Sequence, residues 1–455
     1  MNNRNGVLKY KLILIGLLVV SAAGCSDEIV DEKYYPSNAH DAYKHSLEQA
    51  NLHKTAIGSD WIDASKNVLV NPVEMILPFQ EAFYIDSTSA FASAYFFDVL
   101  HGQKVDIKVE INGRRAVRLF IDLFRVTEDT TRPFIHVASA DENENRLEFE
   151  TRRNARYIVR LQPELLRGGR CNIVIRRTPS VDFPVSGRDE SSIQSFFGDP
   201  RDGGRRVHHG VDIFAPRHTP VVAPAPGRVR FVGERGIGGN VVWLYDSKRY
   251  LHYYFAHLQT QTVERYDAVE EGDTLGTVGN TGNARTTPPH LHFGIYVQGR
   301  GPVDPFHFLA KTDTIPDKIS ADNKLIGEMV RTTSSTVLRE SDGSRNGRIL
   351  KANTAMKILA ASKNMYRVLL PDGFAGYISS TSVELMNEPL QQRSAEKVNI
   401  IKDNPLINAV AMKEINSGKN YFILGEFKNH WFVKDSDDET GWLEISEENS
   451  TRTSL

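Results

Sequence analysis

The chain has 455 residues, of which 40% are hydrophobic and 25% charged, and its formal net charge is -2 at pH 7. The length suggests about three domains at roughly 150 residues each, and the composition excludes long disordered tracts. A charge so close to zero provides no basic field, so we expect no nucleic-acid partner.

The N-terminus has the order of a secretory signal. Basic residues precede an apolar run over 12–20, and the small residues Ala22-Ala23-Gly24-Cys25 follow. The run is too short for a membrane-spanning helix, which needs about 20 apolar residues. Ala22-Ala23-Gly24-Cys25 resembles the lipobox of bacterial lipoproteins, which implies a signal peptide over 1–24 and a lipid on Cys25. That lipid would anchor the protein to a membrane of the cell envelope, and we expect the outer membrane.

Residues 25–62 are expected to form a tether, with a short helix around 39–52. The acidic Ser26-Asp27-Glu28 resembles signals that send some lipoproteins to the outer surface, and a solvated tether explains it equally well. If Cys25 carries lipid, Cys171 has no disulfide partner. Cys171 alternates with Ile173 and Ile175, which favours a small buried residue on a strand over a reactive thiol.

Strand-like alternation dominates residues 63–180. Apolar residues recur at period two in several runs, and turn sequences such as Asn112-Gly113 separate them. Each run is typical of a strand with one buried face, so this segment predicts a β-sandwich. The fold class expected for the whole chain is mainly β and multidomain: this sandwich, a central antiparallel β core, and two small C-terminal β-barrels.

The C-terminal part contains an internal repeat with an offset of 65 residues. Tyr366, Val368, Gly376 and Tyr377 recur as Trp431, Val433, Gly441 and Trp442. Four matches at one offset indicate two related modules, which we place at 325–388 and 393–447. Both resemble bacterial Src-homology-3-like domains. Their aromatic residues could bind a ligand or the cell wall, or form the cores of small barrels, and the sequence favours neither.

Three segments carry groups that could bind a metal or work beside it: His208-His209-Gly210-Val211-Asp212, Ala256-His257-Leu258 and His290-Leu291-His292-Phe293. In the last segment the two imidazoles are two positions apart, so on a strand both point to one face while Leu291 points into the core. Two histidines and one carboxylate suit Zn²⁺ with an open fourth position for water. Because no His-Glu-x-x-His occurs, a histidine must handle protons, and His257 and His290 are the candidates.

Further matching elements lie around these segments in a fixed order: Gly198-Asp199-Pro200-Arg201, Ala215-Pro216, Gly272-Asp273 and Thr281-Gly282. The ordered set resembles the signature of the lysostaphin and LytM-like zinc metalloendopeptidases, and it covers about a hundred residues. The resemblance implies a zinc-bearing groove in a β core at 186–310, and cleavage of peptide bonds in peptidoglycan stems or cross-bridges. It implies the following roles: metal ligands His208, Asp212 and His292, catalytic His257 and His290, and groove-lining Asn240.

The sequence departs from that signature beside the groove. Family members commonly have Gly-Pro before His-Leu-His and a glutamate after the following phenylalanine, whereas this chain has Pro288-Pro289 and Gly294. Both departures bear on the choice of substrate more than on metal binding.

Three functional hypotheses follow. The first is a zinc endopeptidase that cleaves cell-wall peptide by metal-activated water with histidine assistance. The second is a non-catalytic wall-binding scaffold or regulator of other wall hydrolases, which would require lost ligands, and none is lost here. The third is a protease with the same site that acts on foreign proteins, and surface display would favour it.

Overall fold

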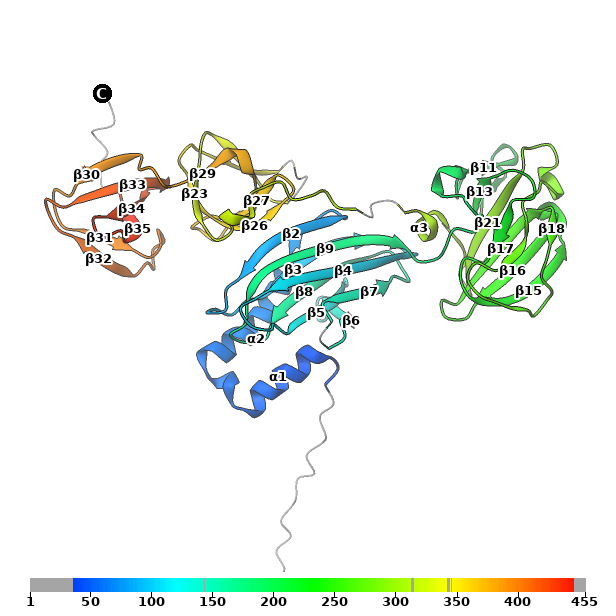
Figure 1. Ribbon diagram of the computed structural model, residues 1–455, viewed down its shortest axis with the longest axis horizontal. Coiled ribbons are helices and arrows are strands. Elements are labelled where there is room, and N and C mark those ends of the chain that lie inside the picture. Colours follow the sequence, from blue (N-terminus) through cyan, green and yellow to red (C-terminus); the bar gives the residue numbers. More distant parts are fainter. Residues whose placement is uncertain (1–35, 143, 312–314, 342–343, 345, 446–455) are drawn as a thin grey trace, which may run out of the picture.

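The computed structural model describes residues 36–142, 144–311, 315–341, 344 and 346–445, so the signal segment and Cys25 lie outside the described residues. The molecule is elongated: a β-sandwich lies in the middle, the central domain at one end and two C-terminal modules at the other (Figure 1). The expectation of a mainly β, multidomain chain is confirmed. None of the helices in the described part has the length and apolar character to span a bilayer.

Two helices precede the sandwich and pack against it, α1 (Ala39–Gln49) and α2 (Ala56–Val70). The side chain of Asn38 caps α1 by accepting a hydrogen bond from the Asp41 amide at 2.8 Å. Trp61 of α2 is buried against Phe120 of the sandwich, and its Nε1 donates to the Pro163 carbonyl at 2.8 Å. The expected tether is therefore folded over most of 39–62, because these helices bury apolar faces on the sandwich.

The sandwich consists of two sheets around one apolar core. Cys171 lies in that core beside Ile173 and Ile175 of the same strand, as the alternation predicts. The strands of the sandwich are β1 (Val73–Glu74), β2 (Phe79–Ile85), β3 (Ser93–Val99), β4 (Gln103–Asn112), β5 (Leu119–Val126), β6 (Phe134–Ser139), β7 (Arg146–Glu150), β8 (Ala155–Pro163) and β9 (Gly169–Pro179).

The first C-terminal module extends one sheet of the sandwich. Strand β26 (Ala355–Ser362) pairs antiparallel with β2, so sandwich and module share a continuous sheet. Beside this joint, the Glu81 carboxylate is fully buried and accepts two hydrogen bonds from Arg367 of the module, at 2.9 and 2.8 Å. The hydroxyls of Tyr95 and Tyr377 donate to the same carboxylate. A buried ionic cluster thus joins two domains far apart in the sequence.

The two C-terminal modules show the repeat as matching hairpins. Val368 pairs with Gly376 in the first module, and Val433 pairs with Gly441 in the second. The aromatic residues of the repeat are all buried, which confirms them as core residues: Tyr366, Tyr377, Trp431 and Trp442. The remaining strands are β23 (Met329–Thr332), β24 (Thr336–Arg339), β25 (Gly347–Leu350), β27 (Met365–Leu369), β28 (Ala375–Ser379), β29 (Val383–Leu385), β30 (Gln391–Ser394), β31 (Asn399–Lys402), β32 (Ala411–Ile415), β33 (Asn420–Phe427), β34 (His430–Asp435) and β35 (Thr440–Glu444).

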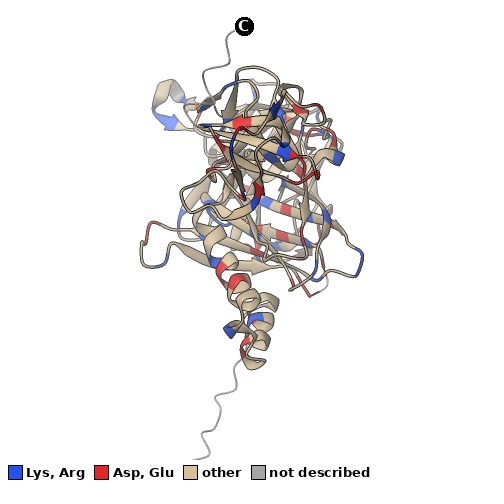
Figure 2. Ribbon diagram, turned by 90° about the vertical axis from the view of Figure 1, so that its left-hand side faces the viewer, with Lys and Arg blue, Asp and Glu red and all other residues tan. Residues whose placement is uncertain are grey.

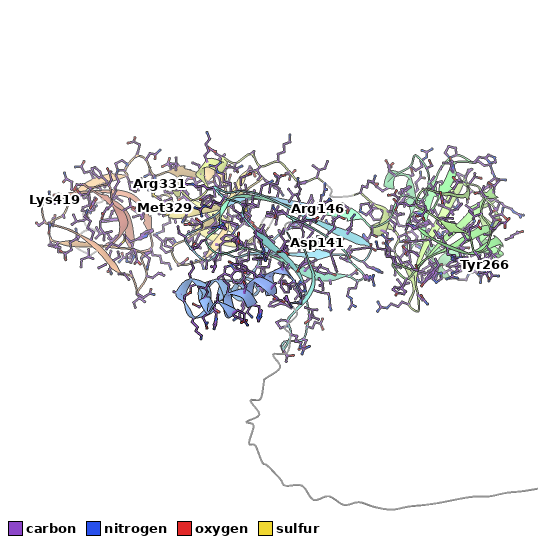
Figure 3. All side chains as sticks on the ribbon, turned by 60° about the horizontal axis from the view of Figure 1, so that its bottom comes forward. Asp141, Arg146, Tyr266, Met329, Arg331 and Lys419 are labelled. Carbon is purple, nitrogen blue, oxygen red and sulfur yellow. The ribbon has the colours of Figure 1, made fainter. Side chains whose placement is uncertain are left out.

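The modules pack on each other through a shared core. Leu424 and Phe432 of the second module belong to the apolar cluster of the first. Arg331 is buried between them and donates to the Leu424 carbonyl at 2.8 Å, and Figure 3 shows it beside Met329 in the first module. Acidic and basic residues are interspersed along the ribbon in Figure 2, in line with the near-zero net charge.

The central domain is built on a large antiparallel sheet with strand order β10-β13-β21-β17-β16-β15-β19. Its strands are β10 (Ile193–Ser195), β11 (Pro200–Arg201), β12 (Arg206–Val207), β13 (Val211–Phe214), β14 (Pro220–Val222), β15 (Gly227–Glu234), β16 (Asn240–Asp246), β17 (Leu251–Leu258), β18 (Thr260–Gln261), β19 (Ala268–Val269), β20 (Thr274–Thr277), β21 (His290–Val297) and β22 (Gly301–Val303). Short helices η4 (Gly236–Gly238), η5 (Gly282–Ala284) and α3 (Phe306–Leu309) complete it.

Several contacts join the central domain to the sandwich, and two of them involve Arg249 and Phe308. Arg249, in the turn between β16 and β17, pairs with Glu150 of β7 at 2.8 Å. Phe308 of α3 packs against the His101 ring, with 5.0 Å between ring centroids. Both contacts lie outside the groove described below.

Candidate active site

Adjacent strands bring Asp212 and His292 together. In the pairing of β13 with β21, these two residues lie directly opposite each other. Leu291 is fully buried, so His290 and His292 share the opposite face of β21, as the His-x-His spacing predicts. His208, just before β13, completes the cluster from the chain that leads into the strand.

Three donor atoms form a nearly equilateral triangle. His208 Nε2 lies 3.0 Å from Asp212 Oδ1 and 2.9 Å from His292 Nδ1, and His292 Nδ1 lies 3.0 Å from Asp212 Oδ1. Among the described residues, these form the one group of at least three potential ligands whose donor atoms all lie within 4.8 Å of one another. Zinc–ligand bonds of about 2.0–2.2 Å allow one ion to contact all three atoms. The donor set therefore fits a zinc ion.

The backbone fixes the tautomer of His208. Its Nδ1 lies 2.8 Å from the Phe196 carbonyl oxygen, which can only accept a hydrogen bond. Nδ1 therefore carries the proton, and Nε2 presents a lone pair to the triangle. Gly210 provides the space for the other imidazole, because a β-carbon there would lie 2.9 Å from the His292 ring and 2.4 Å from the Phe293 carbonyl oxygen.

Asp212 is held as a carboxylate with its two oxygens in different roles. Oδ1 belongs to the triangle, and Oδ2 accepts a hydrogen bond from Arg201 Nη2 at 2.9 Å. Burial opposes ionisation, but hydrogen bonds and charge from His208 and His292 hold the pKa of Asp212 far below its usual value. Burial lowers the pKa of His292, so its neutral, metal-binding form is favoured. The sequence motif contained Arg201 without indicating this contact.

His257 reaches the site through a β-bulge. Along β17, Tyr253 and Phe255 are fully buried in the core. In a regular strand, His257 would point into the core like these two residues. Its φ, however, is 63°, and the register between β16 and β17 shifts at this point. Its ring therefore faces the groove, with the centroid 5.1 Å from that of His290 and 6.0 Å from that of His292. The left-handed residue thus interrupts the alternation of the strand and separates His257 from the buried face of Tyr253 and Phe255.

Both His257 and His290 turn Nε2 towards the groove. The Nδ1 of His257 donates to the Thr281 carbonyl and that of His290 to the Pro288 carbonyl, each at 2.9 Å. Each Nδ1 is therefore engaged by the backbone, which leaves Nε2 as the nitrogen available in the groove. Burial, then the neighbouring histidines, lower the pKa of His257 to about 4, so it is neutral near pH 7.

A groove of about 680 Å³ opens over this cluster. Its floor beyond His292 is aromatic: Tyr254, Trp243 and Tyr296 pack with ring centroids 4.6 Å apart for Trp243–Tyr254 and 5.0 Å for Trp243–Tyr296. Every residue that lines the groove lies between 195 and 296, within the central domain. No local sequence pattern indicated these three rings.

Asn240 lies behind the groove lining. Its amide Nδ2 donates to the Leu258 carbonyl at 3.2 Å, and its backbone N–H donates to Thr281 Oγ1 at 3.0 Å. It supports the loop that bonds to His257, and a direct role in the groove stays a prediction. His209 lies on the groove rim, where it is exposed and stacks on Phe197, outside the ligand triangle.

The sequence around this site matches a known peptidase family: residues 206–305 match Peptidase family M23. The central domain is therefore a peptidase family M23 domain, called the M23 domain below. The M23 domain is similar to L-Ala--D-Glu endopeptidase of Bacillus subtilis, with 38% identity over 122 residues that cover 25% of this chain and 37% of that protein. It is similar to peptidoglycan DD-endopeptidase ShyC of Vibrio cholerae, with 38% identity over 100 residues, which cover 22% of each protein.

Among solved structures, the M23 domain is similar to the catalytic domain of lysostaphin from Staphylococcus simulans. The identity is 32%, the match covers 25% of this chain and 87% of that one, and the TM-score is 0.23. The matches to the two curated relatives above cover only 37% and 22% of their lengths. The chain therefore spans well under half of the length of these two curated relatives.

Proposed function

We propose that this protein is a zinc-dependent endopeptidase that cleaves peptide bonds in peptidoglycan stems or cross-bridges. The observation that carries the proposal is the triangle of His208, Asp212 and His292, with the Nε2 atoms of His257 and His290 facing the same groove. The substrate class follows that of the two relatives named above, an L-Ala--D-Glu endopeptidase and a peptidoglycan DD-endopeptidase.

The residues divide into metal-holding and proton-handling groups. His208, Asp212 and His292 would hold the ion, and Arg201 would keep the second oxygen of Asp212 away from it. A zinc ion bound there supplies a Lewis acid for the scissile carbonyl and makes a water more acidic. His257 Nε2, unprotonated near pH 7, can take a proton from the attacking water and return it to the departing amine.

His290 would also take part in proton handling, and its ring is held in place by two contacts. Its ring stacks on Phe214, with 5.0 Å between centroids and 26° between planes, while its Nδ1–H is fixed on the Pro288 carbonyl. A protonated Nε2 at this place can donate to the oxyanion that forms when the carbonyl is attacked. These positions fit hydrolysis of an amide bond that lies across the two histidines.

We further propose that a lipid on Cys25 anchors the enzyme in the cell envelope, at the outer membrane. Support comes from the lipobox-like sequence alone. Expression with a radiolabelled fatty acid tests it: label should enter the unmodified protein and be lost in Cys25→Ser. Equal labelling of both proteins would remove the anchor from the proposal.

The main experiment digests purified peptidoglycan with the soluble chain from Ser26 to Leu455 and added zinc. New amino termini are quantified and the products identified by mass, while bound zinc is measured on each protein. We expect Asp212→Ala to lose both zinc and activity, because a ligand is gone. We expect His290→Ala to keep zinc and lose activity, because only proton handling is affected.

His307→Ala is the matched control, since this histidine lies on α3 and not in the groove. It should keep both zinc and activity. An Asp212→Ala protein that lacks metal but digests the wall would contradict the zinc mechanism. If the unmodified, zinc-loaded protein binds the wall without releasing any product, the scaffold hypothesis replaces the enzyme.

A further inference from the structure

Among the charged residues that line the groove, arginines outnumber carboxylates. Three are arginines, Arg201, Arg206 and Arg235, and the one carboxylate among them is Asp212. That carboxylate is already engaged by the histidine triangle and by Arg201. Elsewhere in the domain, acidic and basic residues are interspersed. The local excess of positive charge in the groove would therefore suit a negatively charged substrate.

Arg235 is the arginine best placed to meet a substrate. It precedes η4 on the groove rim, its side chain is exposed, and its guanidinium carbon lies 5.8 Å from the centre of the Phe231 ring. Among the described residues no carboxylate forms an ion pair with it. Its charge acts on Tyr254 of the floor: burial raises the pKa of that phenol to about 12, and Arg235 opposes the rise.

Close packing leaves no room for a side chain on the groove floor next to the metal ligands, at position 294. Gly294 lies two residues after His292 on the same strand and directly opposite Tyr254. A β-carbon at Gly294 would lie 3.1 Å from both the Tyr296 ring and the His209 carbonyl oxygen. With no side chain there, the floor around Tyr254 is left to aromatic rings. Such apolar walls strengthen an ion pair formed above them.

We propose that the groove selects an anionic peptide: Arg235 binds a free carboxylate that the substrate carries beside the scissile bond, above the aromatic floor formed by Tyr254, Trp243 and Tyr296. This rests on the proposed endopeptidase function and specifies its substrate. Arg235 is a specificity residue that contributes to binding of the substrate and takes no part in proton transfer. A peptide whose carboxylate is replaced by a neutral carboxamide of the same shape loses this ion pair.

The test uses two synthetic peptides that span the bond identified in the peptidoglycan digest. One carries its non-backbone carboxylates free, and the other carries them as carboxamides. With the zinc-loaded soluble chain, we expect amidation to lower kcat/KM about tenfold, as for the loss of one charge-assisted hydrogen bond. In Arg235→Gln, KM for the free acid should rise about tenfold with kcat nearly unchanged, while KM for the amide stays the same.

Arg265→Gln is the matched control. Arg265 is an exposed arginine of the same domain, outside the groove lining and next to Tyr266, which Figure 3 shows at the end of the domain away from the sandwich. It should leave both peptides unaffected. Equal kcat/KM for the two peptides with the unmodified enzyme, or equal weakening of both by Arg235→Gln, overturns the proposal while the endopeptidase stands. If neither peptide nor the wall is cleaved, the proposed function itself fails.

Discussion

The buried ionic cluster between the sandwich and the first C-terminal module leads to a quantitative prediction. Glu81 is completely buried, and Arg367, only 12% exposed, supplies its two charge-assisted hydrogen bonds. Burial alone would lower the pKa of Arg367, yet the Glu81 carboxylate and the adjacent tyrosines raise it above its usual value. Arg367→Met keeps the volume but leaves a buried carboxylate with only the Tyr95 and Tyr377 hydroxyls as partners.

Removing one partner of a buried ion pair costs about 3–5 kcal/mol. At roughly 1.4 kcal/mol per tenfold, amide exchange through opening of this region accelerates by a factor of about 140 to 3,700. Hydrogen exchange measured by mass spectrometry on peptides from β2, β26 and β27 is the suitable assay, because it reports on one region of a multidomain chain. Peptides from β16 and β17 in the M23 domain are the internal control and should be unchanged.

The double variant Glu81→Gln/Arg367→Met separates charge from packing. With the carboxylate neutralised, the remaining tyrosine hydroxyls can hydrogen-bond to the amide, so most of the lost protection should return. Unchanged exchange of β2 in Arg367→Met would show that the cluster does not hold the joint together. A double variant as unprotected as the single one would show that the arginine acts through packing instead of charge.

Two further predictions concern the sandwich. Burial raises the pKa of the Cys171 thiol to about 12, so in the soluble chain from Ser26 an aromatic disulfide reagent at about pH 8 should titrate no thiol before unfolding and one after it. A thiol that reacts at once in the folded protein would refute its burial. Burial opposes ionisation of Asp122, but His136, Ser139 and Arg160 hold its pKa well below the usual value. Because the folded-state pKa is depressed, the resulting stability is present above the unfolded value of about 3.9 and is lost as pH falls through the folded one. Asp122→Asn should therefore cost about 2–3 kcal/mol near pH 7, with the gap from the unmodified protein closing below about pH 4 in denaturant titrations. A gap that stays constant with pH would contradict this account.

The sequence predicts those parts of the site that depend on local periodicity. His290 and His292 share a strand face because they are two residues apart, and Leu291 enters the core for the same reason. Cys171 and the repeated aromatics of the C-terminal modules follow the same rule. Wherever a strand is regular, spacing alone places the side chain.

The sequence fails where the backbone is irregular or where distant segments meet. The φ of 63° at His257 reverses the direction of its ring, and no residue type there signals a left-handed conformation, since glycine or asparagine would be usual. The contact of Arg201 with Asp212 depends on how the β11–β12 hairpin folds over β13. The pairing of β2 with β26 joins residues almost three hundred positions apart, for which local patterns carry no information.

The arrangement of domains bears on how a substrate would reach the groove of the M23 domain. The neighbouring sandwich touches the M23 domain at residues that include Lys248, Arg249 and Phe308, and none of these lines the groove. The C-terminal modules are held at the other end of the sandwich by the Glu81 cluster (Figure 1). No described residue outside 195–296 borders the groove. In this arrangement the other domains do not cover the groove, and substrate access depends on the loops of the M23 domain itself. Selection would then occur inside the groove, where we propose that Arg235 binds a substrate carboxylate. The Arg235→Gln comparison on paired peptides is therefore more informative than removal of a flanking domain.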